Sequence, residues 1–168
     1  ENLASGLGGG MANLDSSSPT LVDCVFLDNS ANDGGGLANE LGSSPELTNC
    51  TFAGYTASEA GAGGGIFNRD SSDPALLGCT VTSNSARYGG GMHNKASSPI
   101  LVNCLFEGNS AGLWGGGMHS FESSPVLNNC TFQGNSTDVG GRGGGMYNNA
   151  SSTTLASCSF EGNSAGNG

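Results

Sequence analysis

The sequence has few positive charges. Lys and Arg together number 4, against 14 Asp and Glu, which gives a formal net charge of −10. Proteins that bind nucleic acid or anionic lipid need clusters of basic side chains to neutralise phosphates. The four cations, Arg69, Arg87, Lys95 and Arg142, form no basic stripe in the sequence. We therefore expect no nucleic-acid partner.

Long apolar runs and helical periodicity are lacking as well. No run approaches the roughly 18 apolar residues of a membrane-spanning helix, so we expect a chain that does not span a bilayer. No window carries apolar residues at i, i+3, i+4 and i+7 over three turns, because Gly, Ser, Asn and Pro interrupt every candidate. A helical fold is therefore not expected.

Glycine is abundant instead, at 31 of 168 residues, and it marks an internal repeat. Each repeat holds a Gly triplet, a Ser-rich turn that contains Pro in all but the last repeat, a Leu, and a Cys three residues after that Leu. Phe or Val then follows two residues after the Cys, and Asn follows five residues after it, with Tyr55 as the one exception. The triplets begin at Gly8, Gly34, Gly63, Gly89, Gly115 and Gly143. The cysteines are Cys24, Cys50, Cys79, Cys104, Cys130 and Cys158, and the asparagines are Asn29, Asn84, Asn109, Asn135 and Asn163.

A unit of about 27 residues cannot bury a core alone and must stack on copies of itself. Cys and Phe lie two residues apart, as on one face of a strand, whereas Leu and Cys lie three apart, which indicates a bend between them. The sequence predicts an all-β, parallel β-solenoid with three short strands per coil and successive coils about 4.8 Å apart. We expect one domain over residues 1–168, with about six coils of roughly 25–29 residues that begin near residues 8, 34, 63, 89, 115 and 143.

Like residues should then stack in columns: a Leu, a Cys, a Phe and a Met/Leu/Ile column inside the solenoid. The Gly triplet suits a sharp corner that needs positive φ or close backbone approach. The Asn column suits a second corner, because Asn tolerates the left-handed region and its amide can pair with the Asn of the next coil.

The string GGGMHNKASSPILVNCLFEGNSA, residues 89–111, resembles the repeat of right-handed parallel β-helix proteins of microbial surfaces. It is similar to polymorphic outer-membrane protein and autotransporter adhesin repeats, which pair a Gly-Gly-small-aliphatic tetrad with a Phe-x-x-Asn tetrad. The second tetrad reads FLDN, VTSN, FEGN, FQGN and FEGN at residues 26, 81, 106, 132 and 160. The resemblance implies a right-handed solenoid at the cell surface or outside the cell. It does not select among adhesins, autotransporter passengers and polysaccharide lyases, which share this fold.

The cysteine column allows two interpretations. An even number of cysteines in an exported chain is typical of disulfides, here 24–50, 79–104 and 130–158. In-register stacking, however, leaves the Cβ atoms about 4.8 Å apart, beyond the roughly 3.5–4.5 Å of a disulfide. We favour a ladder of buried free thiols. No Cys has a second Cys or His at metal-ligand spacing, so no metal site is expected.

His93 and His119 occupy the same position in adjacent repeats, and so do Tyr88 and Trp114 just before the Gly triplets. The two histidines could share a metal, but we favour an exposed aromatic ladder. The four rings are predicted to form one exposed patch. Such a patch could bind sugars or a neighbouring subunit, or it could merely cover the corner.

Catalysis has one weak candidate, Arg69 and Lys95 in one column with Asp70 beside them. A surface salt-bridge ladder of Glu40, Arg69 and Lys95 is the more ordinary interpretation, and no enzyme activity is expected. No cofactor is expected either, although an acidic chain could take up calcium adventitiously.

The sequence opens with ENLASGLGGGM and closes with FEGNSAGNG, in the same phase of the repeat and without an evident cap. An uncovered terminal coil exposes core and strand edges. We expect either a longer repeat array or subunits that self-associate through their terminal coils, as a filament, a sheath or an adhesin stalk.

Overall fold

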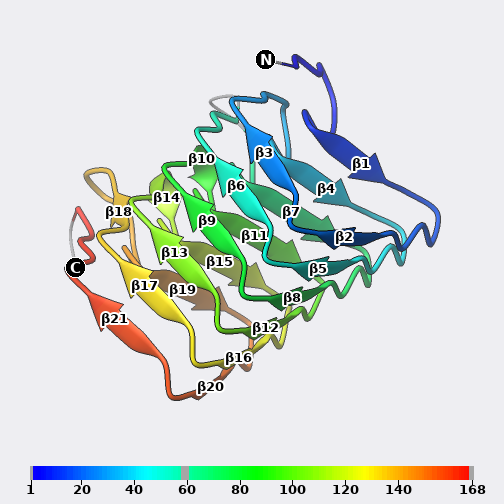
Figure 1. Ribbon diagram of the computed structural model, residues 1–168. Helices are drawn as coiled ribbons and strands as arrows, with labels where there is room; N and C mark the ends of the chain where they lie inside the picture. Colours follow the sequence, from blue (N-terminus) through cyan, green and yellow to red (C-terminus); the bar gives the residue numbers. More distant parts are fainter. Residues whose placement is uncertain (1, 58–60, 167–168) are drawn as a thin grey trace.

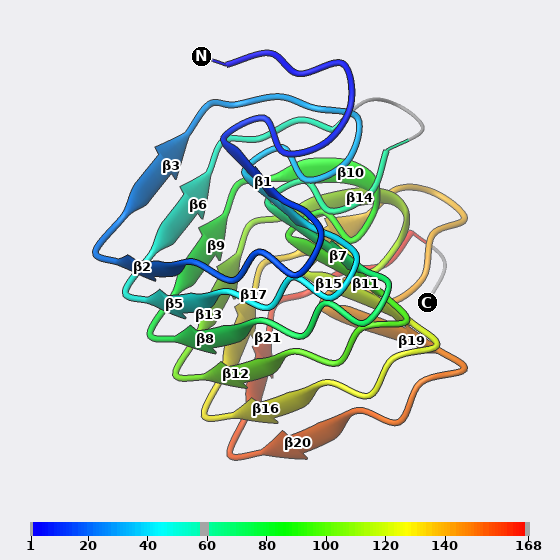
Figure 2. The same cartoon turned by 90° about the vertical axis from the view of Figure 1, so that its right-hand side faces the viewer.

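The computed structural model describes residues 2–57 and 61–166 and forms a parallel β-solenoid. The chain winds through six coils, and each strand pairs in parallel with its counterparts in the coils before and after it (Figure 1). In Figure 2 the strands β2, β5, β8, β12, β16 and β20 follow one another as the rungs of one ladder. The predicted all-β solenoid is therefore confirmed. Nowhere in the described ranges is there a helix long and apolar enough to cross a membrane.

Three six-stranded sheets form the sides of the solenoid. The first contains β1 (Met11–Asn13), β4 (Leu37–Asn39), β7 (Ile66–Arg69), β11 (Met92–Lys95), β15 (Met118–Phe121) and β19 (Met146–Asn149). The second contains β2 (Thr20–Val22), β5 (Glu46–Thr48), β8 (Ala75–Leu77), β12 (Ile100–Val102), β16 (Val126–Asn128) and β20 (Thr154–Ala156). The third contains β3 (Val25–Leu27), β6 (Thr51–Ala53), β9 (Thr80–Thr82), β13 (Leu105–Glu107), β17 (Thr131–Gln133) and β21 (Ser159–Glu161).

A fourth, three-stranded sheet was not predicted. It consists of β10 (Ser85–Tyr88), β14 (Ser110–Trp114) and β18 (Ser136–Thr137). In these coils the chain stays extended after the Asn column and pairs with the neighbouring coil, whereas elsewhere the same segment makes only isolated bridges such as Leu3 to Ser30. Three of the coils thus have four strands instead of three.

The four predicted core columns lie inside the solenoid and form one cluster. Leu101, Cys104, Phe106 and Met92, one from each column, are all at most 2% exposed. Register is kept through the columns, for example from Phe106 to Phe132, whose rings stack with centroids 4.7 Å apart. Like-on-like stacking thus gives a narrow, continuous core.

The predicted bend between Leu and Cys is present in all six coils. The residue before each cysteine has a positive φ between 52° and 64°; these residues are Asp23, Asn49, Gly78, Asn103, Asn129 and Ser157. Most are Asn, Asp or Gly, the residues that enter the left-handed region most readily. The bend turns the chain from the second sheet into the third.

The Gly triplet meets both predicted requirements. Its first residue has positive φ, for example 59° at Gly89. Its second and third residues lie against the backbone of the next coil, so that a Cβ on Gly91 would lie 2.6 Å from the carbonyl oxygen of Gly117. This corner turns the chain into the first sheet, which carries the candidate site on its outer face.

Candidate functional site

The candidate site lies on the outer face of the first sheet, where strand residues alternate between core and surface. The second residue of each strand points outward, and register stacks Phe67, His93, His119 and Tyr147 in one column. Tyr88 of β10 and Trp114 of β14 are partners in the fourth sheet, one residue before the Gly triplets. The triplet corner folds this fourth sheet back as a wall beside the column.

The six rings form one group, which we call the aromatic cluster: Phe67, Tyr88, His93, Trp114, His119 and Tyr147. Tyr88 and Trp114 have centroids 5.1 Å apart, and each contacts the ring of His119, at 6.0 and 5.5 Å. The sequence therefore grouped Tyr88, His93, Trp114 and His119 correctly.

Their predicted exposure, however, is wrong for the histidines. His93 is 6% exposed and His119 is 3% exposed, whereas Tyr88 and Trp114 are half-buried. The reason is the unpredicted fourth sheet, which sets Tyr88 and Trp114 over the imidazoles. The histidines form the floor of the site and not an exposed ladder.

The two imidazoles are joined to each other. Their Nδ1 atoms lie 2.9 Å apart, so one ring donates a hydrogen bond and the other accepts it. Burial lowers the pKa of His93 to about 3, with further lowering from His119 and Lys95. Burial likewise lowers the pKa of His119 to about 4. Both rings are therefore neutral at pH 7, which suits an apolar floor.

A cleft of about 470 Å³ opens beside the cluster. Tyr88 and Trp114 contribute its wall and His93 and His119 part of its floor, and Phe67 and Phe121 also line it. The polar lining consists of Asp33, Arg69, Lys95 and Asn149. The site thus combines ring faces with charged groups of both signs.

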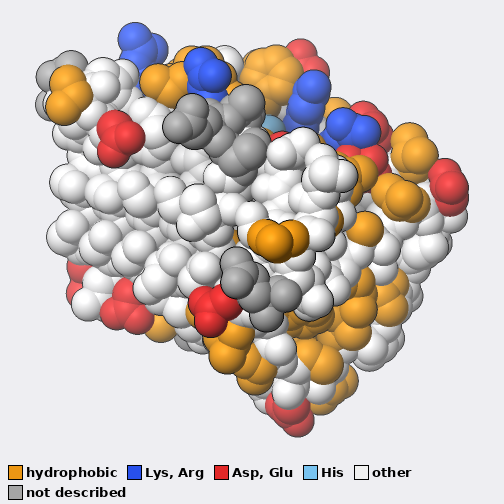
Figure 3. Space-filling model, turned by 90° about the horizontal axis from the view of Figure 1, so that it is seen from above, with side chains coloured by type: hydrophobic (Ala, Val, Ile, Leu, Met, Phe, Trp, Pro, Cys, Tyr) orange, Lys and Arg blue, Asp and Glu red, His pale blue; other side chains and the backbone are white. Residues whose placement is uncertain are grey.

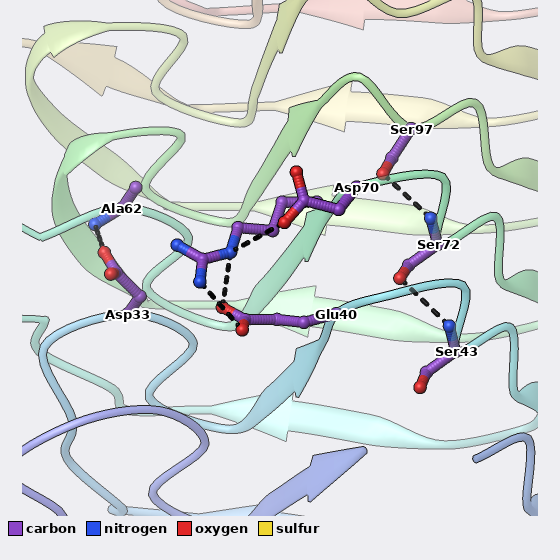
Figure 4. A network of polar contacts seen from close by, with 8 residues as sticks. Asp33, Glu40, Ser43, Ala62, Asp70, Ser72 and Ser97 are labelled. Carbon is purple, nitrogen blue, oxygen red and sulfur yellow. Dashed lines mark hydrogen bonds and ion pairs between the residues drawn. The ribbon is translucent and has the colours of Figure 1, made fainter. Parts of the chain in front are cut away.

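Arg69 is held by two carboxylates at the edge of this cleft. Its Nε lies 2.7 Å from Glu40 Oε1 and 3.3 Å from Asp70 Oδ2, and its Nη2 donates to Glu40 Oε2 at 2.9 Å. Figure 4 shows Glu40 and Asp70 converging on the guanidinium, with Asp33 turned to the backbone N–H of Ala62. Burial raises the pKa of Glu40, and Arg69 opposes that rise.

Lys95 is the register partner of Arg69 in the next coil, as the predicted ladder required. Within residues 2–57 and 61–166, however, Arg69 is the only Lys or Arg with an ion pair. Lys95 is exposed and carries a free ammonium group there. The ladder of Glu40, Arg69 and Lys95 is therefore an ion pair with a free cation beside it.

The described part of the chain contains no group of three or more His, Cys, Asp or Glu side chains that could hold a metal ion. Around Arg69, Lys95 and Asp70, the candidate catalytic residues, the fold adds the carboxylates of Glu40 and Asp33 and the amide of Asn149.

The cysteine column lies in the core, away from the cleft, and all six cysteines are free thiols. Those of the four inner coils are buried, and Cys24 and Cys158 are half-buried. Each of the inner four donates to a carbonyl of the preceding coil, as Cys104 Sγ does to Leu76 O at 3.6 Å. Hydrogen bonding to Cys104 lowers the pKa of Cys79 and of Cys130 to about 7, while the same contacts raise the pKa of Cys104.

The Asn column forms the predicted amide ladder. Asn84 Nδ2 donates to Asn109 Oδ1 at 3.0 Å, Asn109 Nδ2 to Asn135 Oδ1 at 2.9 Å, and Asn135 Nδ2 to Asn163 Oδ1 at 2.9 Å. Tyr55, the exception, is fully buried, and its hydroxyl accepts from Asn29 at 3.4 Å. The left-handed role was wrongly assigned, because the residue before each Asn takes positive φ and the Asn itself does not, as Gly108 and Asn109 illustrate.

A second amide ladder was missed. Asn13 donates to Asn39, Asn39 to Asn68 and Asn68 to Asn94, at 2.8 to 2.9 Å. These residues are buried on the inner face of the first sheet. The sequence does contain a pattern that predicts this ladder. Each of the first four Gly triplets is followed by an apolar residue, and an Asn lies two residues after that apolar residue.

A family model described as "right handed beta helix region" matches residues 2–164. No curated protein and no solved structure matches the chain significantly. The match therefore supports a right-handed β-helix fold for nearly the whole chain.

Proposed function

The chain belongs to the right-handed β-helix family, and from that premise we propose that it is a structural, non-enzymatic rod of the cell surface or extracellular space. In this proposal its coils serve as a rigid spacer, in a filament, a sheath or an adhesin stalk. Self-association through terminal coils would lengthen the rod. The resemblance to microbial surface repeats supports the location.

One observation carries the structural role: the three long sheets keep an unshifted register through all six coils. Because the core columns repeat from coil to coil, the end face of one coil presents the same kinds of core residues as the face on which it would stack. Leu155 and Phe160 show what a further coil would cover, since each is 45% exposed while Leu127 and Phe132 one coil earlier are fully buried. That further coil could belong to the same chain or to a neighbouring copy.

Electron microscopy at rising protein concentration tests self-association. We expect rods that lengthen with concentration, and Phe160→Glu should shorten them by placing a charge on the stacking face. Val126→Glu is the matched control, because Val126 is 43% exposed on the side of the solenoid. Circular dichroism of both variants checks that the strands are retained. Short rods of one length at every concentration would contradict self-association.

A second candidate function, binding of glycans, is favoured by the aromatic cluster and its cleft. Half-buried Tyr88 and Trp114 offer ring faces on a rigid support, and such faces stack on the C–H surfaces of sugars. A glycan array with the wild type and with Trp114→Ala tests it. Signals that Trp114→Ala leaves unchanged would contradict binding at this cluster.

A further inference from the structure

Two of the four cations of this acidic chain, Arg69 and Lys95, line the cleft. Arg87 lies over the ring of Tyr88, with its guanidinium carbon 5.4 Å from the centroid, and Arg142 bridges to Trp114 in the next coil. Figure 3 shows the Lys and Arg side chains along one edge of the molecule, with a histidine visible between them. The chain carries 14 acidic residues, so this edge is where an anion meets the least repulsion.

The carboxylates on the same face leave part of this positive charge free. Glu40 and Asp70 are engaged by Arg69, and Asp33 Oδ1 accepts the backbone N–H of Ala62 at 2.8 Å. Lys95 has no such partner among the described residues, and its charge reaches into the cleft, since it contributes to the lowered pKa of His93. Among the described residues, Lys95 is thus a cation without an ion pair that lines the same cleft as the aromatic floor.

We propose that this cleft binds a sugar that carries a carboxylate, with the sugar ring against Tyr88 and Trp114 and the carboxylate at Lys95. The proposal rests on the second candidate function and gives that function its ligand class. The ring faces of Tyr88 and Trp114 would stack on an apolar, planar surface of the ligand. A free ammonium adds a charge-assisted hydrogen bond to a carboxylate. The charge of Arg87, whose guanidinium lies over the Tyr88 ring, further favours an anion.

The small number of cations near the cleft suits a ligand that carries few charges better than it suits a nucleic acid. Arg69 and Lys95 are partners in adjacent strands, so their backbones are about 4.8 Å apart. Nucleic acids bind through many phosphate contacts that each need a cation. A chain with four cations in all and a net charge of −10 offers too few.

The fluorescence of Trp114, the single tryptophan, reports on the cleft directly. The intact chain is titrated with trigalacturonic acid, with sialyllactose, with neutral maltotriose and with a short single-stranded oligonucleotide. We expect saturable changes with one or both acidic sugars, which distinguishes a uronate from a sialylated source. We expect binding of maltotriose to be at least about tenfold weaker, which corresponds to roughly 1.4 kcal/mol.

Lys95→Gln should weaken binding of the acidic sugar by about tenfold and leave the weak maltotriose binding unchanged. Asn128→Asp is the control for net charge. Like Lys95→Gln it lowers the net charge by one unit, but it does so at an exposed position of β16, away from the cleft. It should bind like the wild type. Both positions are exposed, so both variants should fold.

The outcomes separate the proposals. Equal binding of maltotriose and the acidic sugars, or no effect of Lys95→Gln, would overturn the acidic ligand and leave glycan binding standing. No response to any sugar would overturn both. Tighter binding of the oligonucleotide would overturn the sugar and favour nucleic acid. None of these results changes the expectation for rod assembly, which electron microscopy tests separately.

Discussion

Replacing Asn109 by Ala should destabilise the solenoid strongly, because this one side chain joins three coils. Its Oδ1 accepts from the backbone N–H and from Nδ2 of Asn84, at 3.1 and 3.0 Å. Its Nδ2 donates to Val81 O at 2.8 Å and to Asn135 Oδ1 at 2.9 Å. The residue is completely buried, so no water can replace these partners.

The magnitude follows from the groups left unpaired. Asn109→Ala leaves two N–H groups of Asn84 without a partner and removes one of the bonds to the Val81 carbonyl and to Asn135 Oδ1. A buried polar group without a partner costs about 1–3 kcal/mol, so the expected loss in free energy of unfolding is about 4 kcal/mol or more. The control is Asn128→Ala, at an exposed position without side-chain hydrogen bonds among the described residues, where we expect a change within about 0.5 kcal/mol.

Urea unfolding should be followed by two probes, the far-ultraviolet circular dichroism of all coils and the fluorescence of Trp114 in the neighbouring strand. Two probes are needed because stacked repeats can unfold coil by coil. A loss below about 1 kcal/mol for Asn109→Ala, with coincident transitions and an unchanged denaturant slope, would refute the assignment of the ladder as a main source of stability.

Three further predictions follow from the corners, the core and the cleft floor. Gly90→Ala should lower Tm, because its Cβ would overlap the carbonyl oxygen of Ser110 and prevent tight stacking of the coils. Gly134→Asn, at an open position with φ 62°, should leave Tm unchanged. Thermal unfolding of the two variants measures the difference. A thiol reagent should modify the two half-buried cysteines quickly in the native protein and all six after denaturation; fewer than six would mean disulfides. The pKa values of His93 and His119, about 3 and about 4, lie below the roughly 6.5 of an unfolded chain, so the unfolded state binds more protons between these values. Stability should therefore fall as pH drops from about 6.5 to 4, and this part of the fall should vanish in the double variant with both histidines changed to Phe; an equal fall of Tm in that variant would contradict the assignment.

The core of the fold could be predicted from the sequence because stacking repeats the same environment at every turn. The fixed distance from Leu101 to Cys104 and on to Phe106 placed a bend and a strand, and both are present. The alternation of two in a strand also identified which side chains face inward. A regular solenoid leaves few other solutions for such a pattern.

The cleft was harder to predict, because it depends on how a surface segment folds over its neighbours. Ser110 to Trp114 carries no alternation of apolar and polar residues, and the strand exists because its backbone pairs with β10. That pairing buries His93 and His119, which a column of like residues alone would leave on the surface. Sequence spacing thus gave the grouping of the rings, and the tertiary fold decided their burial.

The unshifted register has a consequence for how such a chain can change length during evolution. If residues 89–114 were deleted, the first sheet would join Ile66 directly to Met118, and the Leu, Cys and Asn columns would still place like against like. Duplication of the same segment would add one rung without a new loop or a new core. A gene encoding these coils can therefore alter the reach of the rod in single-coil steps through unequal recombination, whereas the cleft, whose lining includes residues of the coils that begin at residues 63, 89 and 115, would change with any of them.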